Sequence, residues 1–526
     1  MDQLQKPGSG KELIAFASIV PARVIFSVYR FYSSPLRNIL GSLLARVINL
    51  WYFCKVYEGH LEKENIELHQ KYGKIVRIAP NEFSIDDPDA IKVIYGHGTG
   101  FPKAGWYYGW TDPMQKNETL FTTRSIFHHT IQRRKYATSH SMSTLVGYEG
   151  FVDECGRILS RRFEELSGAN LVINSGEWMQ YYAFDIIGAI TFSKRFGFLN
   201  NGEDIGGLIQ ANDNRRMCAT LAGIYPSLHP LLFRVVSYLP SSGAAGFQYL
   251  FKFANERIGE RKLWLGTEAD DGPMDQVGRF LTAHMKRPDY FTTQDVLMGS
   301  LANILAGSDT TAISLSAILH YLCTHPEKMQ KLRDKIDSIA KRGQVSDPVT
   351  LKETQTMTYL QAVIKESLRL HPATGLRLAR KVPKGGATIS GEFFPEGATV
   401  GINTWVAHYN RDIFGPDAHL FRPKRWIGAD EKALSVMEQY NFPFGLGSCG
   451  CISKNISLLE IGKVIPQLVR RFDFELEEPG RELHCVNHWF VKQTDLRCRL
   501  PMRRQSTKVQ GYRGTGAIPR HHATMP

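Results

Sequence analysis

The chain has 526 residues, of which 43% are hydrophobic, and it carries a formal net charge of +13. It is long enough to bury a large core, and no internal repeat or linker divides residues 60 to 500. The charge does not indicate nucleic-acid binding, because the sequence has no recognition helix, zinc-binding pattern or basic-aromatic stripe. Its eight cysteines form no CxxC pair and no disulfide framework, which favours a reducing compartment.

The N-terminus is the first segment with a pattern of its own. The stretch from Leu13 to Val28 is mostly apolar, but Pro21 and Arg23 interrupt it, so it falls short of the ~20 residues expected of a membrane-spanning helix. No small-residue cleavage site marks a removed signal peptide. Leu40 to Cys54 has the character of a second contact with a membrane surface. The family resemblance described below implies that residues 1–38 form a membrane anchor and hinge.

Two further segments offer candidate ligand contacts. Aromatic side chains gather between residues 106 and 121, at Trp106, Tyr107, Tyr108, Trp110 and Phe121. They either line a pocket for an apolar or aromatic ligand, or face the core or a membrane. Next, His129 and Arg133 lie four residues apart and therefore on one face of a helix. Arg134 and Lys135 follow at once, so a solvated basic helix is the alternative.

Apolar residues at steps of three and four predict a helix from about Gln294 to Cys323. At ~1.5 Å per residue, such a helix would cross a whole domain. Its centre, Ala306-Gly-Ser-Asp-Thr-Thr311, is poor in helix-forming residues, and threonine hydroxyls compete for backbone carbonyls. We therefore expect the helix to loosen from Gly307 to Thr310, with Asp309 and Thr310 as an acid and a hydroxyl for proton delivery. The alternative is a satisfied polar patch in a buried helix.

A charged pair occupies the next predicted helix, Tyr359 to Leu370. Glu366 and Arg369 are three residues apart and share a face, so they can form a charge-assisted hydrogen bond. Downstream, Arg425 is a third member that could lock the pair. We assign these residues to the fold rather than to catalysis.

A glycine-rich loop then runs into an apolar helix. Phe444, Gly447 and Cys451 have the spacing F-x-x-G-x-x-x-C. The glycines let the backbone approach a flat macrocycle, and the start of a helix offers N–H groups to a buried sulfur anion. This arrangement is suited to a cysteine thiolate that ligates a haem iron, which favours cleavage of an O–O bond.

The loop permits a second register, because Phe442, Gly445 and Cys449 have the same short spacing. We prefer Cys451 as the ligand. Cys449 is then a small loop residue, with competition for the iron or disulfide formation as the alternatives.

Taken in order, these motifs resemble the cytochrome P-450 superfamily: Gly-Ser-Asp-Thr-Thr311, Glu366-x-x-Arg369, Phe421-x-Pro-x-Arg-Trp426 and the Cys451 loop. The resemblance covers nearly the whole chain. The phrases Tyr-Arg-Phe-Tyr32 and Lys-Asn-Ile-Ser-Leu-Leu-Glu460 are similar to fungal membrane-bound members, notably the pisatin demethylase-like group.

The resemblance implies a mainly α fold with small β-sheets, a single large haem-binding domain over residues 39–500 with a long central helix, and a basic disordered tail over 501–526. It implies haem b with Cys451 as the axial thiolate. Further expected haem contacts are His129, Arg133, Ala306, Gly307, Arg380, Phe444 and Gly445.

The activity that the resemblance implies is a monooxygenase that inserts one oxygen atom from O2 into an apolar or aromatic small molecule, in secondary-metabolite biosynthesis. Electrons come from NADPH through a separate NADPH-cytochrome reductase, with cytochrome b5 as a further donor. The net charge suits docking to such acidic electron-transfer proteins or to anionic lipid. The expected location is the endoplasmic reticulum membrane, with a single-pass anchor and a cytosolic catalytic domain.

Two departures from the family loop, F-G-x-G-x-R-x-C-x-G, qualify this picture. Cys449 stands where the family has an arginine that pairs with a haem propionate, and Ser453 stands where it has glycine. The alternative function is therefore the same fold with weakened haem binding, acting as a non-hydroxylating haem enzyme or an inactive membrane-bound ligand binder.

Overall fold

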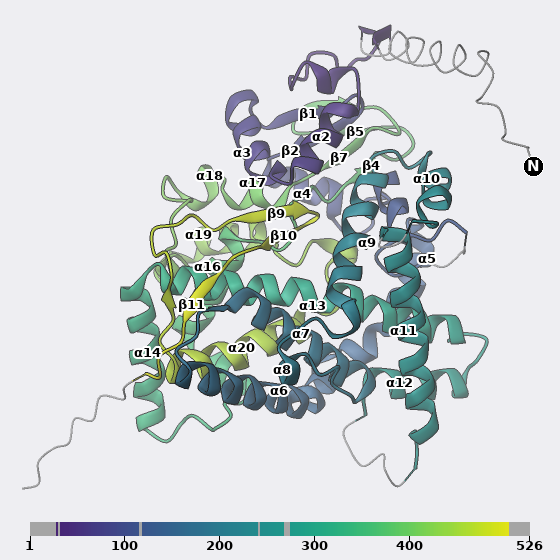
Figure 1. Cartoon of the computed structure of the whole chain (residues 1–526). Coiled ribbons are helices and arrows are strands. Elements are labelled where there is room, and N and C mark those ends of the chain that lie inside the picture. Colours follow the sequence, from purple (N-terminus) through teal and green to yellow (C-terminus); the bar gives the residue numbers. More distant parts are fainter. Residues whose placement is uncertain (1–27, 30–31, 115–117, 240–241, 268–273, 504–526) are drawn as a thin grey trace, which may run out of the picture.

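A computed structural model describes residues 28–29, 32–114, 118–239, 242–267 and 274–503. Within these residues helices predominate, and the strands form small separate sheets (Figure 1). The fold class predicted from the sequence is therefore confirmed.

The helices are distributed along most of the described chain. They are α2 (Leu50–Glu58), α3 (Leu61–Tyr72), α4 (Pro88–Tyr95), α5 (Ile126–Ala137), α6 (Met142–Gly168), α7 (Ser175–Phe192), α8 (Phe198–Asn201), α9 (Leu208–Ala222), α10 (His229–Val236), α11 (Gly243–Trp264) and α12 (Gln276–Lys286). They continue with α13 (Thr293–Cys323), α14 (Pro326–Lys341), α15 (Leu351–Thr356), α16 (Thr358–Leu370), α17 (Thr404–His408), α18 (Arg411–Phe414), α19 (Glu431–Tyr440) and α20 (Lys454–Arg471).

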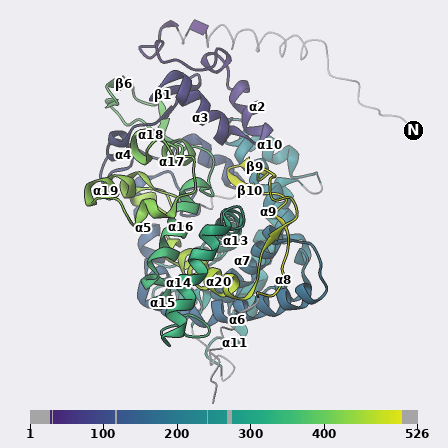
Figure 2. The same cartoon turned by 90° about the vertical axis from the view of Figure 1, so that its left-hand side faces the viewer.

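Helix α13 crosses the centre of the molecule, and α7 and α20 run beside it (Figures 1 and 2). Its start is fixed by a capping box, in which the Thr292 hydroxyl accepts from the Asp295 N–H while the Asp295 carboxylate accepts from the Thr292 N–H. Most of its side chains are buried, and they lie on several faces of the helix. Its apolar residues therefore surround much of the helix instead of forming a single stripe.

The predicted loosening of α13 is wrong, because the helix is continuous through Gly307 and Thr310. The Thr310 hydroxyl donates to the Ala306 carbonyl at 2.9 Å without displacing the backbone ladder. Gly307 serves packing: a Cβ there would lie 2.8 Å from Cδ1 of Ile187, so the glycine lets α7 approach α13 closely. The sequence pattern was correct about which residues are unusual and wrong about what they do to the backbone.

The main sheet has the strand order β1-β2-β7-β4, formed by β1 (Ile75–Ala79), β2 (Glu82–Ile85), β7 (Thr399–Gly401) and β4 (Arg380–Lys381). Strand β2 pairs antiparallel with β1 and parallel with β7, with Phe83 opposite Val400. The other sheets join β9 (Cys485–His488) to β10 (Phe490–Gln493), β5 (Ala387–Ile389) to β6 (Glu392–Phe394), and β11 (Arg497–Arg499) to β3 (Ile173–Asn174) and β8 (Glu475–Leu476). The main sheet places Arg380 beside the cavity described below.

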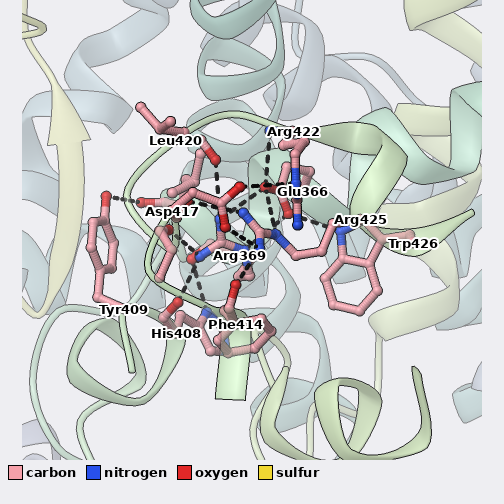
Figure 3. A network of polar contacts seen from close by, with 12 residues as sticks. Glu366, Arg369, His408, Tyr409, Phe414, Asp417, Leu420, Arg422, Arg425 and Trp426 are labelled. Atoms are coloured by element: carbon pink, nitrogen blue, oxygen red, sulfur yellow. Dashed lines mark hydrogen bonds and ion pairs between the residues drawn. The ribbon is translucent and has the colours of Figure 1, made fainter. Parts of the chain in front are cut away.

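The predicted lock between Glu366, Arg369 and Arg425 is present (Figure 3). Arg369 pairs with Glu366 at 2.8 Å and Arg425 Nε reaches the same carboxylate at 3.3 Å, with the Glu366 and Arg369 side chains fully buried. The Trp426 indole N–H donates to the second Glu366 oxygen at 2.9 Å, and Arg369 also donates to the His408 carbonyl. Burying these charges is tolerable because each has several partners.

This network reaches the Cys451 loop through one neutral histidine. His408 Nδ1 lies 3.0 Å from the Arg369 carbonyl, and its Nε2 accepts from the Phe442 N–H at 2.9 Å. Since Nε2 is the acceptor, the proton lies on Nδ1. The lock thereby positions the start of the loop.

In the part of the chain that the structure describes, no helix is long and apolar enough to cross a membrane. The stretch Leu13–Val28 lies almost wholly outside the described residues, as does the predicted tail beyond residue 503. The division into anchor, domain and tail stays a prediction.

Candidate active site

The glycines of the Cys451 loop are required by close contacts. Gly447 has φ +59°, and a Cβ there would come within 2.0 Å of the Tyr95 carbonyl oxygen, so no other residue fits. Gly445 also has a positive φ, of +73°. The Cys451 N–H donates to the Phe444 carbonyl at 2.8 Å and closes the loop just before α20.

The Cys451 side chain is exposed, yet the surrounding protein desolvates its sulfur and so raises the pKa of its thiol. The N–H groups of Ser453 and Lys454, at the start of α20, and the charge of Arg133 act in the opposite direction and favour a thiolate. Ser453 itself has φ −92°, which any residue adopts, so this departure from the family loop causes no backbone strain.

Helix α5 brings both of its predicted residues to the loop. Arg133 Nη1 donates to the Gly450 carbonyl at 2.7 Å, next to Cys451. His129 is buried and forms a hydrogen bond with Cys449. The prediction that His129 and Arg133 share one helix face is therefore confirmed. Both side chains contact the loop that holds Cys451.

A cavity of about 150 Å³ lies beside Cys449. Cationic side chains dominate the charge of its lining, and of the residues that the structure describes there none is an aspartate or glutamate. The lining includes Lys103, Arg124, His129, Arg380 and Cys449. Such a surface suits a ligand with carboxylate groups.

Lys103, like Arg124, is a cationic residue of this cavity that the sequence analysis did not single out. Its side chain is buried, and burial lowers the pKa of its ammonium group to about 8. Two of its three N–H donors bind the Leu120 and Phe121 carbonyls at 2.8 Å each, which leaves the third for a ligand. Arg380 Nη1 donates to the Tyr107 hydroxyl at 3.2 Å, so Arg380 is held in place from the 3₁₀ segment Gly105–Trp110.

Cys449 belongs to this cationic cavity. Burial raises the pKa of its thiol, but the hydrogen bond from His129 and the charges of Arg380 and Lys103 more than offset it and lower the pKa to about 6. Cys449 and Cys451 are both free, so the structure contains no disulfide between them.

One face of α13 is accessible at its centre although most of the helix is buried. Ala306 is exposed, and Gly307 and Thr310 are partly exposed. The next residue, Thr311, has its hydroxyl 2.9 Å from the Ser457 hydroxyl of α20. The accessible face of α13 is thereby pinned to the helix that Cys451 precedes.

Asp309 points elsewhere. It is buried, and its carboxylate accepts hydrogen bonds from Gln180 of α7 at 2.6 Å, Asn212 of α9 at 2.9 Å and Arg216 of α9 at 2.7 Å. The structure therefore does not present Asp309 and Thr310 as a free acid beside a free hydroxyl. Nothing in the sequence pattern singled out Gln180, Asn212 or Arg216, because they lie 93 to 129 positions away.

Four of the five aromatic residues, Trp106, Tyr107, Trp110 and Phe121, form one cluster, whereas Tyr108 packs against His229. Trp106 lies 4.8 Å from Trp489 and 5.4 Å from Trp110 between ring centroids, and Phe121 packs against both Trp106 and Trp110. Trp110 and Trp489 share a buried core cluster with Ile313 of α13. They are core aromatics that adjoin the central helix.

The sequence model of the family described as Cytochrome P450 matches residues 43–496. The chain belongs to the cytochrome P450 family. It is 37% identical over 485 residues to a pisatin demethylase from Fusarium vanettenii, which covers 91% of this chain and 94% of the relative. It is also 35% identical over 496 residues to the cytochrome P450 monooxygenase cicH from Emericella nidulans, which covers 93% and 98% of the two chains.

This P450 is an oxidoreductase of the monooxygenase class that uses haem with an axial cysteine thiolate, O2 and NADPH-derived electrons delivered by a redox-partner reductase. The structure fits the cofactor in two respects. A cysteine on a tight glycine loop precedes a helix, as an iron-binding thiolate needs, and the acid-free cationic cavity matches the two carboxylates of haem b.

Proposed function

We propose that this P450 inserts one oxygen atom from O2 into an apolar or aromatic small molecule of secondary metabolism, with Cys451 as the iron ligand. The observation that carries the proposal is the Thr311–Ser457 hydrogen bond, because it holds the accessible Ala306–Thr310 face of α13 and the Cys451 loop within one site. The similarity to a pisatin demethylase supports a small organic substrate.

Haem, when bound, supplies the oxidising chemistry, and the chain supplies orientation and proton control. We assign proton delivery to Thr310, whose hydroxyl lies on the accessible face and is held by the Ala306 carbonyl until a stronger acceptor is present. Asp309 can act as the acid only after its bond to Arg216 opens, since its three hydrogen-bond partners all donate to its side-chain oxygens.

The charge that the family places at position 449 is supplied here by other residues. We assign the propionate contacts to Lys103 and Arg380, with His129 beside them, because these side chains surround Cys449 in the cationic cavity. Arg133 is assigned to the loop backbone at Gly450. This arrangement argues against the alternative of a chain with weakened haem binding.

Membrane attachment rests on exposed apolar side chains. Leu43, Leu44 and Leu50 near the start of the described chain are 74%, 58% and 52% exposed. Leu231 and Val235 of α10 are also exposed, and α10 lies toward the same end of the molecule as α2 (Figures 1 and 2). We assign this end to the endoplasmic reticulum membrane, with a single-pass anchor, a cytosolic catalytic domain, and NADPH-cytochrome reductase and cytochrome b5 as partners.

The test is the carbon-monoxide difference spectrum of the reduced protein in microsomes. We expect a long-wavelength thiolate band in the natural chain and its loss in Cys451→Ala, whereas Cys449→Ala retains it. A thiolate band that survives in Cys451→Ala would overturn the ligand assignment. NADPH consumption with added reductase then separates a monooxygenase from an enzyme that rearranges its substrate without net oxidation.

A further inference from the structure

A second, smaller pocket lies between α9, α10, α11 and the 3₁₀ segment Gly105–Trp110. It has a volume of about 20 Å³, enough for one small polar group, since a water molecule needs roughly 10–15 Å³. Its lining includes Trp110, Thr111, Arg215, His229 and Phe247. It shares no lining residue with the cationic cavity beside Cys449.

Arg215 is the charged group of this pocket. It is only 7% exposed, and within the described residues no hydrogen bond or ion pair joins its guanidinium to an acceptor. Its Nε is buried without a partner. Arginine is rarely buried unless it is paired, because desolvating the charge costs free energy that an opposite charge must offset.

The protein stacks aromatic rings against this cation instead. The Arg215 Cζ lies 5.2 Å from the Trp110 ring centroid and 6.0 Å from that of Phe247. Cation–π contacts of this kind contribute ~0.5–2 kcal/mol and leave the hydrogen-bond donors in the guanidinium plane unused. The Trp110 indole N–H is a further buried donor without a partner among the described residues.

The charges around Arg215 leave its guanidinium protonated and free to bind an anion. Burial and the neighbouring Arg216 lower the pKa of Arg215 to about 10, so it stays protonated at neutral pH. Asp309 acts in the opposite direction, but its carboxylate oxygens are bonded to Gln180, Asn212 and Arg216. Burial lowers the pKa of His229, and the hydrogen bond between its Nε2 and the Thr111 carbonyl at 2.9 Å partly offsets this effect.

From the unpaired, stacked Arg215 and the donor of Trp110 beside it, we propose that this pocket is a binding site for the carboxylate of an organic acid. The planar fork of the guanidinium matches a carboxylate, and a pocket of about 20 Å³ admits that group while the apolar body of the acid stays outside it. Trp110 lines this pocket and belongs to the same buried core cluster as Ile313 of α13.

The inference that this ligand is a substrate rests on the proposed monooxygenase function. Its binding at Arg215 is independent of that function. The experiment is isothermal titration calorimetry on the haem-loaded full chain in detergent micelles, with 4-phenylbutyrate and its neutral amide as probes. We expect the acid to bind at least tenfold more tightly than the amide. Arg215→Met keeps the length and the stacking of the side chain and should remove this preference, and Arg215→Lys should retain part of it.

The control is Lys252→Met on α11, which removes a 78%-exposed cation and should leave the preference unchanged. Equal affinity of the natural chain for acid and amide, or an acid preference that persists in Arg215→Met, would overturn the proposal. If Arg215→Met does not fold, Arg215→Gln provides the same comparison with a polar side chain. Because calorimetry needs neither reductase nor turnover, an inactive enzyme that still prefers the acid would refute the function and not the site.

Discussion

Arg216 of α9 donates a 2.7 Å hydrogen bond to Asp309 of α13, with both side chains almost completely buried. Arg216 also pairs with Asp213 at 2.9 Å, and Asp213 pairs with Lys492 of β10 at 2.9 Å. The central helix, α9 and the β9–β10 hairpin are thereby joined by one chain of opposite charges.

The first prediction concerns this pair. Arg216→Met should lower the free energy of unfolding by ~3–5 kcal/mol, because Asp309 is left as a buried carboxylate without its cation. The second change Asp309→Leu, added to Arg216→Met, should recover much of the loss. Urea unfolding measures both. Lys194→Met, at an exposed ion pair with Glu260, is the control and should change stability by less than ~1 kcal/mol.

Thr310→Ala should leave haem content and substrate binding unchanged and divert electrons from product to hydrogen peroxide. The reason is that Thr310 carries the hydroxyl of the accessible α13 face, whereas Thr311 is bonded to Ser457. The measurement is product formed and peroxide released per NADPH consumed. Thr310→Ser keeps the hydroxyl and is the matched control. Unchanged coupling in Thr310→Ala would remove this residue from proton delivery.

The proposed charge compensation predicts a rescue. Lys103→Met should speed haem loss about tenfold, because a cation next to the carboxylates is removed. Cys449→Arg should restore retention in the Lys103→Met background and add little in the natural chain. Transfer of haem to apomyoglobin, followed by absorbance, gives the rates. Lys365→Met, which removes an exposed cation paired with Glu438, is the control. Additive effects of the two changes would show that position 449 and Lys103 do not share a role.

His408 predicts a pH dependence. Burial lowers the pKa of its imidazole from 6.5 to about 3 in the native state, while the unfolded chain takes up a proton near 6.5. The unfolded state therefore binds one more proton between these values, so stability is retained above pH 6.5 and is lost as the pH falls below it, by up to ~1.4 kcal/mol per unit.

Urea unfolding at pH 7.5, 6 and 5 measures this slope. His408→Gln should reduce the slope of unfolding free energy against pH by up to ~1.4 kcal/mol per unit, the contribution of one proton. His128→Gln, at an exposed histidine, should leave the slope unchanged. An equal slope in His408→Gln and the natural chain would show that His408 is not the group responsible.

The sequence predicted the elements whose signal is local or whose motif has a fixed spacing. Helix α13 was expected over Gln294–Cys323 and spans Thr293–Cys323, because the apolar steps that predict it are contiguous in sequence. The Glu366–Arg369–Arg425 lock was also expected, since the first pair is set by helix geometry and the third member by a motif.

The partners of Asp309 and the cations around Cys449 could not be predicted in the same way. These residues come together only when α7, α9 and the segment before the 3₁₀ helix Gly105–Trp110 have packed, as Gln180, Arg216 and Lys103 show. A single buried arginine or lysine also has no periodic pattern in the sequence. The expected loosening of α13 failed for a related reason. Whether a glycine breaks a helix or admits a neighbour depends on what packs against it, and here Ile187 does.

The lock around Glu366 also bears on how the chain can be shortened. Arg425 and Trp426 follow Glu366 by 59 and 60 positions, and both bind its carboxylate. A polypeptide that ends between Glu366 and Arg425 lacks two partners of the Glu366 carboxylate. Its completed helices therefore cannot bury the Glu366–Arg369 pair in a stable intermediate. We therefore expect polypeptides truncated in this region to be degraded by proteases rather than to fold as smaller proteins.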